Sequence, residues 1–189
     1  MLDENPIFEA LDRSIVERRA LPLDQPLAIT SPEGELGITA SAFAVPGKVP
    51  LYLESKTGGD LSGAPDETIG LELAAGGKSF YYMPGCARLT PHIRDRIKGA
   101  SLLFFDGTLW RDDEMIVAGV GSKTGQRMGH MSMSGPQGSI AAFSDLGIRR
   151  KIFIHLNNTN PALLRDSVER AQLAEAGWEV AADGDEIEL

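Results

Sequence analysis

The hydrophobic pattern of the chain changes character near residue 90. Before that point, proline and glycine separate short apolar segments whose length and composition are typical of β-strands. These segments are residues 27–30, 37–45, 49–54, 68–75 and 79–83. After it, helical and strand-like segments alternate. This order predicts an α/β fold in a single domain spanning residues 1–189.

An amphipathic helix is expected near the amino terminus, over residues 6–20. Apolar residues recur there at helical spacing, with an asparagine cap and a proline at the first helical position. The apolar positions are Ile7, Leu11, Ile15 and Val16. A second helix should begin at Thr90 and Pro91 and stop at Gly99.

In the second half, the continuously apolar run at residues 101–105 predicts a strand buried on both faces, and residues 151–154 predict another strand. Between them we expect a short acidic segment, a glycine- and methionine-rich loop over 120–136, and a helix near 137–145. Asp166, with Glu169 three residues later, forms a capping-box pattern for a last helix that ends at Gly177. Residues 178–182 and 186–189 are predicted as terminal strands around a turn.

Composition narrows the class of protein. The 189 residues are 42% hydrophobic, and no apolar run approaches the roughly 20 residues of a membrane span. A formal net charge of -9 argues against a surface that neutralises nucleic-acid phosphates. Cys86, the one cysteine, excludes an intrachain disulfide, and residues 1–8 do not resemble a secretory signal. We therefore expect a cytoplasmic protein with no nucleic-acid partner.

Polar side chains follow the two most apolar strands. Asp106 comes directly after the first and His155 directly after the second. In α/β sheets, ligands bind beyond the carboxyl ends of the strands. If these strands are parallel neighbours, a carboxylate and an imidazole meet at one edge of the sheet, where they suit a metal site or acid-base chemistry.

Each residue also has a purely structural interpretation. An aspartate before a glycine commonly accepts backbone hydrogen bonds in a turn, and a histidine at a strand end commonly caps the strand. The spacing of these residues does not decide between the structural and the functional interpretation.

The glycine-rich loop offers a third candidate region. Lys123, Arg127 and His130 could contact an anionic group, and the glycines would let backbone approach a ligand, although a solvated loop explains the same pattern. Asn157 and Asn158, after His155, could orient the imidazole or hold a polar substrate, or simply satisfy a turn. Neither a P-loop nor a dinucleotide-binding glycine motif is present.

Several of these segments together resemble one known family. They are AVPGKVPLYLE, YMPGCA, LLFFDGTLWRDDEMIVAGVGSKTGQRMGHMSMSGPQGS and IFIHLNNTNP. The sequence is similar to the carboxyl-terminal part of the pyrroloquinoline quinone (PQQ) biosynthesis protein B family, of the metallo-β-lactamase superfamily. The resemblance covers essentially the whole chain, and the long block from DGTLW to NNTNP is its most specific part.

The resemblance implies roles for particular residues. His155 takes a metal-ligand position, Asp106 lies at the active-site strand end, and His130 lies in the loop bordering the pocket. Where many superfamily members carry histidine and aspartate ligands, this sequence has Lys48 and Cys86, which argues against a two-metal hydrolase. The cysteine-rich zinc site and the Asp/His motif of the family's amino-terminal part are not present.

The resemblance also implies a function. The family is regarded as a non-haem iron hydroxylase of the tyrosine ring in a peptide-derived Glu-Tyr precursor, in which Arg127, His130 and Asn157 would hold the glutamate-bearing substrate. Iron, or zinc in its place, would bind weakly to this chain, which by itself would turn over little substrate. The alternatives are a non-catalytic carrier that binds or transports PQQ or its precursor to the periplasm, and a superfamily hydrolase.

The implied fold is a metallo-β-lactamase-like αβ/βα sandwich without its amino-terminal part. One sheet should then lack partners and expose apolar area, which favours self-association. The implied partners are the peptide-derived precursor and other proteins of PQQ biosynthesis.

Overall fold

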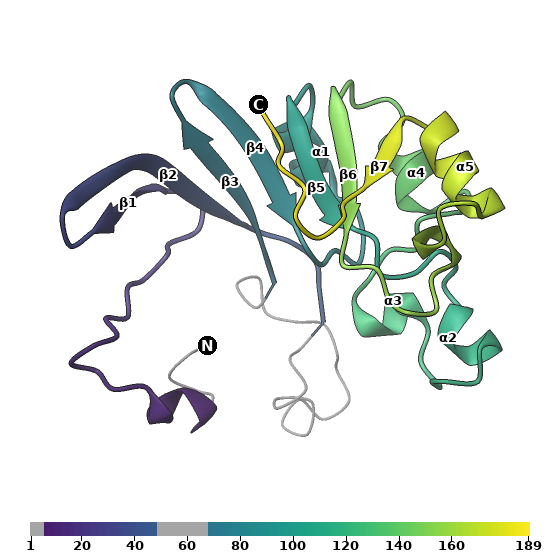
Figure 1. Cartoon of the computed structure of the whole chain (residues 1–189), viewed down its shortest axis with the longest axis horizontal. Coiled ribbons are helices and arrows are strands. Elements are labelled where there is room, and N and C mark those ends of the chain that lie inside the picture. The colour runs from purple at the N-terminus through teal and green to yellow at the C-terminus, as the bar shows by residue number, and fades with distance from the viewer. Residues whose placement is uncertain (1–5, 49–67) are drawn as a thin grey trace.

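The computed structural model describes residues 6–48 and 68–189, whose strands form one mixed sheet (Figure 1). Seven strands follow one another across the sheet in chain order. They are β1 (Pro26–Ser31), β2 (Gly34–Ala44), β3 (Ile69–Ala75), β4 (Lys78–Met83), β5 (Leu102–Asp106), β6 (Arg150–Ile154) and β7 (Trp178–Val180). The segment predicted as a strand at 49–54 lies outside the described residues.

The helices are short. They are the 3-10 helices η1 (Pro6–Ala10) and η3 (Pro161–Leu163), and the α-helices α1 (Pro91–Ile97), α2 (Glu114–Val117), α3 (Gly125–Met128), α4 (Ser139–Ala142) and α5 (Val168–Glu175). No helix within the described ranges has the length and apolar character that crossing a membrane requires.

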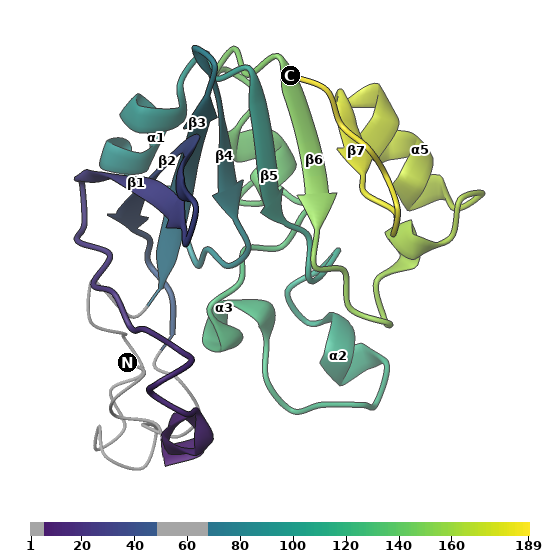
Figure 2. The same cartoon turned by 60° about the vertical axis from the view of Figure 1, so that its left-hand side comes forward.

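The sheet changes from antiparallel to parallel at β4. Strands β1 to β4 pair antiparallel, whereas β4 to β7 pair parallel, with helices in the crossovers. The carboxyl ends of β4, β5 and β6 therefore meet at one edge, beside α2 and α3 (Figure 2). Asp106 is the register partner of Ile154, so the condition for Asp106 and His155 to lie at one edge is met.

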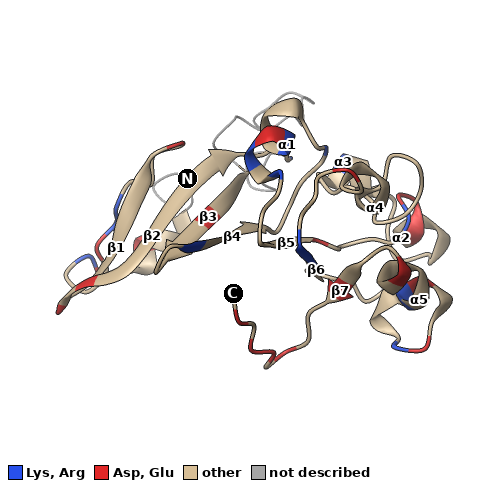
Figure 3. Ribbon diagram, turned by 90° about the horizontal axis from the view of Figure 1, so that it is seen from above, with Lys and Arg blue, Asp and Glu red and all other residues tan. Residues whose placement is uncertain are grey.

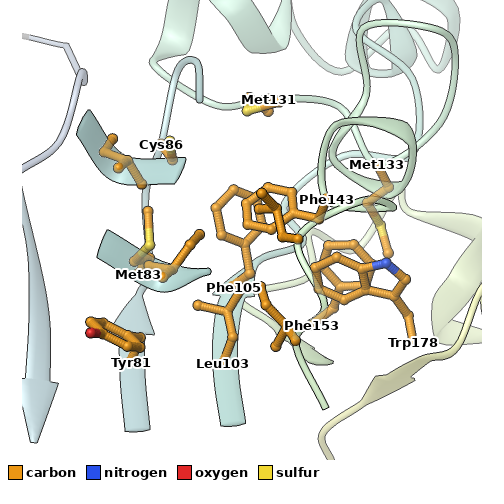
Figure 4. Close-up of a cluster of buried hydrophobic side chains, with 14 of the residues drawn as sticks. Tyr81, Met83, Cys86, Leu103, Phe105, Met131, Met133, Phe143, Phe153 and Trp178 are labelled. Carbon is orange, nitrogen blue, oxygen red and sulfur yellow. The ribbon is translucent and has the colours of Figure 1, made fainter. Parts of the chain in front are cut away.

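The hydrophobic core lies between the sheet and the helices on one of its faces (Figure 4). Aromatic rings fill its centre. Phe105 lies 4.6 Å from the ring of Phe143, and Phe153 stacks on Trp178 with ring centroids 3.9 Å apart. Trp178 thereby connects the short strand β7 to the centre of the sheet, because stacked rings bury large apolar areas.

Within residues 6–48 and 68–189, no helix covers the opposite face of the sheet. Seen from above, α1, α3 and α4 lie on one side, and the carboxyl-terminal residues after β7 run across the other (Figure 3). Lys78 of β4 donates a hydrogen bond to the carbonyl of Leu189 there. Phe80, Tyr82 and Phe104 form a row of contacting rings on this face and stay partly exposed. This agrees with the expected incomplete sandwich.

The predicted amino-terminal helix is wrong beyond its first turns. Only η1 forms, and the apolar stripe does not pack: Ile7 is 71% exposed and Ile15 is 80% exposed. An isolated helix of this length is marginal in water without a packed apolar face, so spacing alone does not make one.

Two details at the carboxyl terminus also differ. Ser167, not Asp166, caps α5, and its hydroxyl accepts a hydrogen bond from the backbone N–H of Arg170 at 3.0 Å. Residues 186–189 form no strand, because the chain after β7 crosses the face of the sheet instead of pairing along its edge. The cap at Thr90 and the stop at Gly99 are confirmed.

Candidate active site

A buried carboxylate at the end of β5 holds a histidine from the glycine-rich loop. The Asp106 side chain is fully buried, and its Oδ2 accepts a hydrogen bond from His130 Nδ1 at 2.6 Å. Its Oδ1 accepts from the Thr108 hydroxyl at 2.6 Å and from the Thr108 backbone N–H at 3.1 Å. Thr108 Oγ1 also lies 3.2 Å from His130 Nδ1. Asp106 therefore forms the predicted turn and also orients an imidazole.

Local backbone geometry places both partners. Gly107 follows Asp106 where β5 passes close to β6: a Cβ there would lie 2.9 Å from the Cβ of Phe153. Its N–H donates to the carbonyl of Ile154 at 2.7 Å. On the other side, Gly129 ends α3 in a left-handed conformation, with φ of 89°, and turns the chain into His130.

The pair is arranged for proton transfer. An ionised carboxylate only accepts hydrogen bonds, so Nδ1 of His130 carries the proton that Asp106 binds. In the neutral ring, Nε2 then holds the lone pair. The His130 side chain is 25% exposed, whereas Asp106 is wholly buried. A buried acceptor that orients a partly exposed imidazole is the arrangement used by general acid-base groups.

His155 lies at the same edge but outside this network. It follows β6 directly, is exposed, and adopts φ of 63°, a conformation that residues other than glycine rarely take. Its imidazole forms no hydrogen bond within the described segments, so the strand-capping alternative is not observed. The ring is therefore available to a ligand.

The described residues do not by themselves form a metal site. No group of three or more His, Cys, Asp or Glu side chains among them is placed to hold an ion. Both oxygens of Asp106 are engaged by the protein. The Cys86 thiol is buried and donates to the carbonyl of Arg88 at 3.2 Å. Burial raises the pKa of Cys86 to about 12, which keeps the thiol protonated at neutral pH.

A second network, not predicted from the sequence, joins the loops after β5 and β6. The Thr159 hydroxyl donates to Glu114 Oε1 at 2.6 Å and accepts from Asn157 Nδ2 at 2.8 Å. Glu114, which is buried, also accepts from the backbone N–H of Trp110 at 2.7 Å. Asn160 Nδ2 donates to the carbonyl of Gly107 at 2.8 Å. The sequence of the acidic stretch around Glu114 does not indicate which of its carboxylates is buried.

In the part of the chain that the structure describes, the residues predicted to bind substrate lie in different surroundings. Asn157 supports the loop network, and Arg127 and Asn158 are exposed. Neither they nor Lys123 line a cavity of about 420 Å³ that the structure places near Met131 and Ser132. The polar residues that line it are Arg88, Asp112, Gln126, Ser132 and Gln137.

Most glycines in and beside this loop pack against the protein's own chain, whereas Gly135 has open space around it. A Cβ on Gly125 would lie 2.9 Å from Leu109, one on Gly129 equally close to Lys48, and one on Gly138 only 2.2 Å from the carbonyl oxygen of Ser134. Close packing therefore explains these glycines. His92, on α1, is exposed.

The mixed sheet, with its polar residues at the carboxyl ends of parallel strands, matches a known class of protein. Residues 1–156 match the family model of the beta-lactamase superfamily domain, and the chain belongs to this family. The metallo-β-lactamase fold expected from the sequence is thereby confirmed.

Within this class, the similarity is to one particular protein. The chain is 60% identical over 185 residues to coenzyme PQQ synthesis protein B of Gluconacetobacter diazotrophicus, and 53% identical over 189 residues to the protein of that name from Xanthomonas axonopodis pv. citri. The match covers 97% and 100% of this chain, but 60% and 61% of those proteins. The family resemblance seen in the sequence is confirmed, and the chain spans about three fifths of these relatives.

Solved structures agree. Zn(2+)-bound PqqB from Methylobacterium extorquens matches with a TM-score of 0.90 and 45% identity, over 100% of this chain and 61% of that one. A metallo-beta-lactamase fold protein, YhfI from Bacillus subtilis, matches with a TM-score of 0.53 and 13% identity, which shows the fold alone.

Proposed function

We propose that the chain acts in PQQ biosynthesis, as part of an iron-dependent hydroxylase of the tyrosine ring in a peptide-derived Glu-Tyr precursor. The similarity to coenzyme PQQ synthesis protein B over nearly the whole chain carries this proposal. The chain spans only part of those relatives, so the activity and the substrate are proposed and not shown. We also propose that other PQQ biosynthesis proteins are its partners and that it is located in the cytoplasm.

The catalytic roles assigned to this chain are limited to proton transfer and substrate orientation. Asp106 fixes the ring of His130, and Nε2 of His130 exchanges a proton with the substrate. We assign four further residues to binding the polar groups of the substrate: Lys123, Arg127, Asn157 and Asn158. The described residues do not complete a ligand set for the metal.

His155 is the proposed metal ligand of this chain. Its exposed imidazole, without a hydrogen-bond partner among the described residues, fits a neutral nitrogen ligand for iron or zinc. One such ligand binds a metal weakly, since iron and zinc sites normally have three or more protein ligands. The zinc of the Methylobacterium extorquens protein supports a metal in relatives of this fold.

The test combines metal binding and turnover. Titration with Fe²⁺ under anaerobic conditions should show weak binding that His155→Ala abolishes and His92→Ala, the exposed control, leaves unchanged. Incubation with the precursor, Fe²⁺, oxygen and an added two-electron reductant should add one oxygen atom to little of the peptide, with the other oxygen atom reduced to water. Mass spectrometry detects that product, and His130→Gln should remove it. Tight stoichiometric iron uptake, or binding unaffected by His155→Ala, would contradict the proposal.

A carrier role is the second candidate, favoured by the polar cavity lined by Arg88, Gln126 and Gln137. Small-molecule sites have comparable volumes, in the range of about 300–1,000 Å³. Calorimetry with PQQ and its precursors distinguishes the two: affinity that is independent of metal, and lost in Arg88→Ala, identifies a carrier. The superfamily hydrolase alternative is disfavoured by the protonated, buried thiol of Cys86 at a position that bears an aspartate in many members.

A further inference from the structure

The loop after β6 holds a histidine in a conformation that costs free energy. Among the described residues other than glycine, only Asp24 and His155 have positive φ. A left-handed conformation brings the Cβ close to the following carbonyl oxygen, so it persists only where surrounding contacts fix the backbone. His155 itself contributes no side-chain hydrogen bond within the described segments. The contacts that hold it therefore come from its neighbours.

Two backbone hydrogen bonds fix the chain on either side of His155. The carbonyl of Ile154 accepts from the N–H of Gly107 at 2.7 Å, and the N–H of Asn157 donates to the carbonyl of Thr108 at 3.0 Å. Both bonds join the loop after β6 to the loop after β5, which carries the Asp106 to His130 interaction. The position of His155 thus depends on how firmly these two loops are connected.

Glu114, Asn157 and Thr159 make that connection, and we call these three residues the rim clamp. The hydroxyl of Thr159 donates to Glu114 and accepts from Asn157, so it serves as donor and acceptor at once. Glu114 Oε2 accepts from the backbone N–H groups of Trp110 and Arg111. A buried carboxylate with all these donors is a strong and specific acceptor. It ties the loop after β6 to the chain that follows β5.

We propose that Glu114 and Thr159 are positioning residues, which hold His155 in its left-handed conformation at the carboxyl edge of the sheet. They act through the side-chain amide of Asn157, which donates to Thr159, rather than by touching the ligand. This inference deepens the proposed function and rests on it, because the value of a fixed His155 lies in its role as a ligand. The conformation itself can be measured without a metal.

The test uses the three histidines of the chain as reporters. The ring Cε1–H signals of His92, His130 and His155 are recorded by ¹H–¹³C NMR in the metal-free protein. Thr159→Val preserves the shape of the side chain but removes the donor and acceptor, whereas Thr159→Ser keeps both. We expect the His155 signal to shift or broaden in Thr159→Val, the His92 signal to stay in place, and Thr159→Ser to restore the parent spectrum.

A second pair of variants guards against loss of the fold. Glu114→Gln should perturb the His155 signal in the same direction, while Glu175→Gln, the same change at an exposed site on α5, should not. An unshifted His155 signal in both Thr159→Val and Glu114→Gln, with the fold intact, would overturn the inference. A shift of all three histidine signals, including that of His92, would also overturn it, because the clamp would then support the whole fold.

Adding Zn²⁺ to the same samples separates this inference from the proposed function. If the His155 signal of the parent protein does not respond to Zn²⁺, the ligand role fails, whereas the positioning role is judged by the metal-free spectra alone. If it responds, we expect a weaker response at equal Zn²⁺ in Thr159→Val. An equal response in Thr159→Val and the parent would contradict a positioning role for the clamp.

Discussion

Burial decides what individual polar residues of this protein do. Asp106 and Glu114 are both buried carboxylates, but each accepts several hydrogen bonds, which offset the cost of removing it from water. Cys86 is equally buried and has one weak acceptor. Its thiol is therefore expected to behave as a packed apolar group rather than as a nucleophile.

This gives a prediction about pH. Burial raises the pKa of Cys86 from 9.0 to about 12, so above pH 9 the unfolded chain loses this proton before the folded one does. The stabilisation is complete below pH 9 and is lost as pH rises toward 12, by an amount on the order of a few kcal/mol. Urea unfolding across this range should show the free energy of unfolding decreasing.

Cys86→Ala is the variant that identifies the source of this dependence. It removes the titrating thiol, so its free energy of unfolding should fall less steeply between pH 9 and 12. Burial also raises the pKa of Tyr81, so Tyr81→Phe is the matched comparison. It measures how much of the decrease in the free energy of unfolding comes from Tyr81. An unchanged slope in Cys86→Ala would contradict the assignment.

At the level of elements, hydrogen bonds at helix ends and contacts along helix faces decide which predicted segments form. The helix expected over residues 6–20 has the right spacing but no partner surface, and only η1 forms. Helix α5 is not strongly amphipathic, yet it forms because Leu173 is buried in the core and Ser167 caps its amino end. Periodicity therefore proved a weaker guide than a buried contact.

The cap of α5 can be tested directly. Ser167→Ala should lower the free energy of unfolding by about 1 kcal/mol, because the N–H of Arg170 loses its acceptor. Asp166→Ala, at the position that the capping-box pattern favoured, should change it by less than about 0.5 kcal/mol. Thermal or urea unfolding of both variants measures the difference, and a larger effect at Asp166 would show that the cap is misassigned.

On the scale of the whole molecule, the helices that the structure describes over the sheet all lie on the same face of it. The opposite face carries the contacting rings of Phe80, Tyr82 and Phe104, which are partly exposed. The carboxyl-terminal residues after β7 run along this side of the sheet (Figure 3). Apolar surface of this kind promotes association. Self-association through this face therefore stays a prediction for the chain alone.

Sedimentation at increasing protein concentration measures that association. Phe80→Lys should weaken it and should also reduce binding of an apolar fluorescent dye, because a charge is placed in the row of rings. Ile116→Lys makes a similar change at a residue of α2 that is 45% exposed and lies away from the sheet, so it should have no effect. Equal behaviour of the two variants would exclude the sheet face as the contact.

The sequence by itself determined most of the strands, the α/β class, the family resemblance and the positions of Asp106 and His155 at strand ends. These features are local: proline and glycine end the strands, and apolar runs of four or five residues mark buried ones. The family resemblance can likewise be recognised from sequence motifs alone, without knowing where those motifs lie in the fold.

Only the tertiary structure decided which histidine meets Asp106, and which acidic residue near α2 is buried. His130 is 24 residues from Asp106, and Thr159 is 45 residues from Glu114. Contacts over such separations depend on the path of the loops between β5 and β6, which no periodicity specifies. The tertiary structure also decided which face of the sheet the described helices cover. That depends on where the helices pack, and not on the sequence of the strands that form the face.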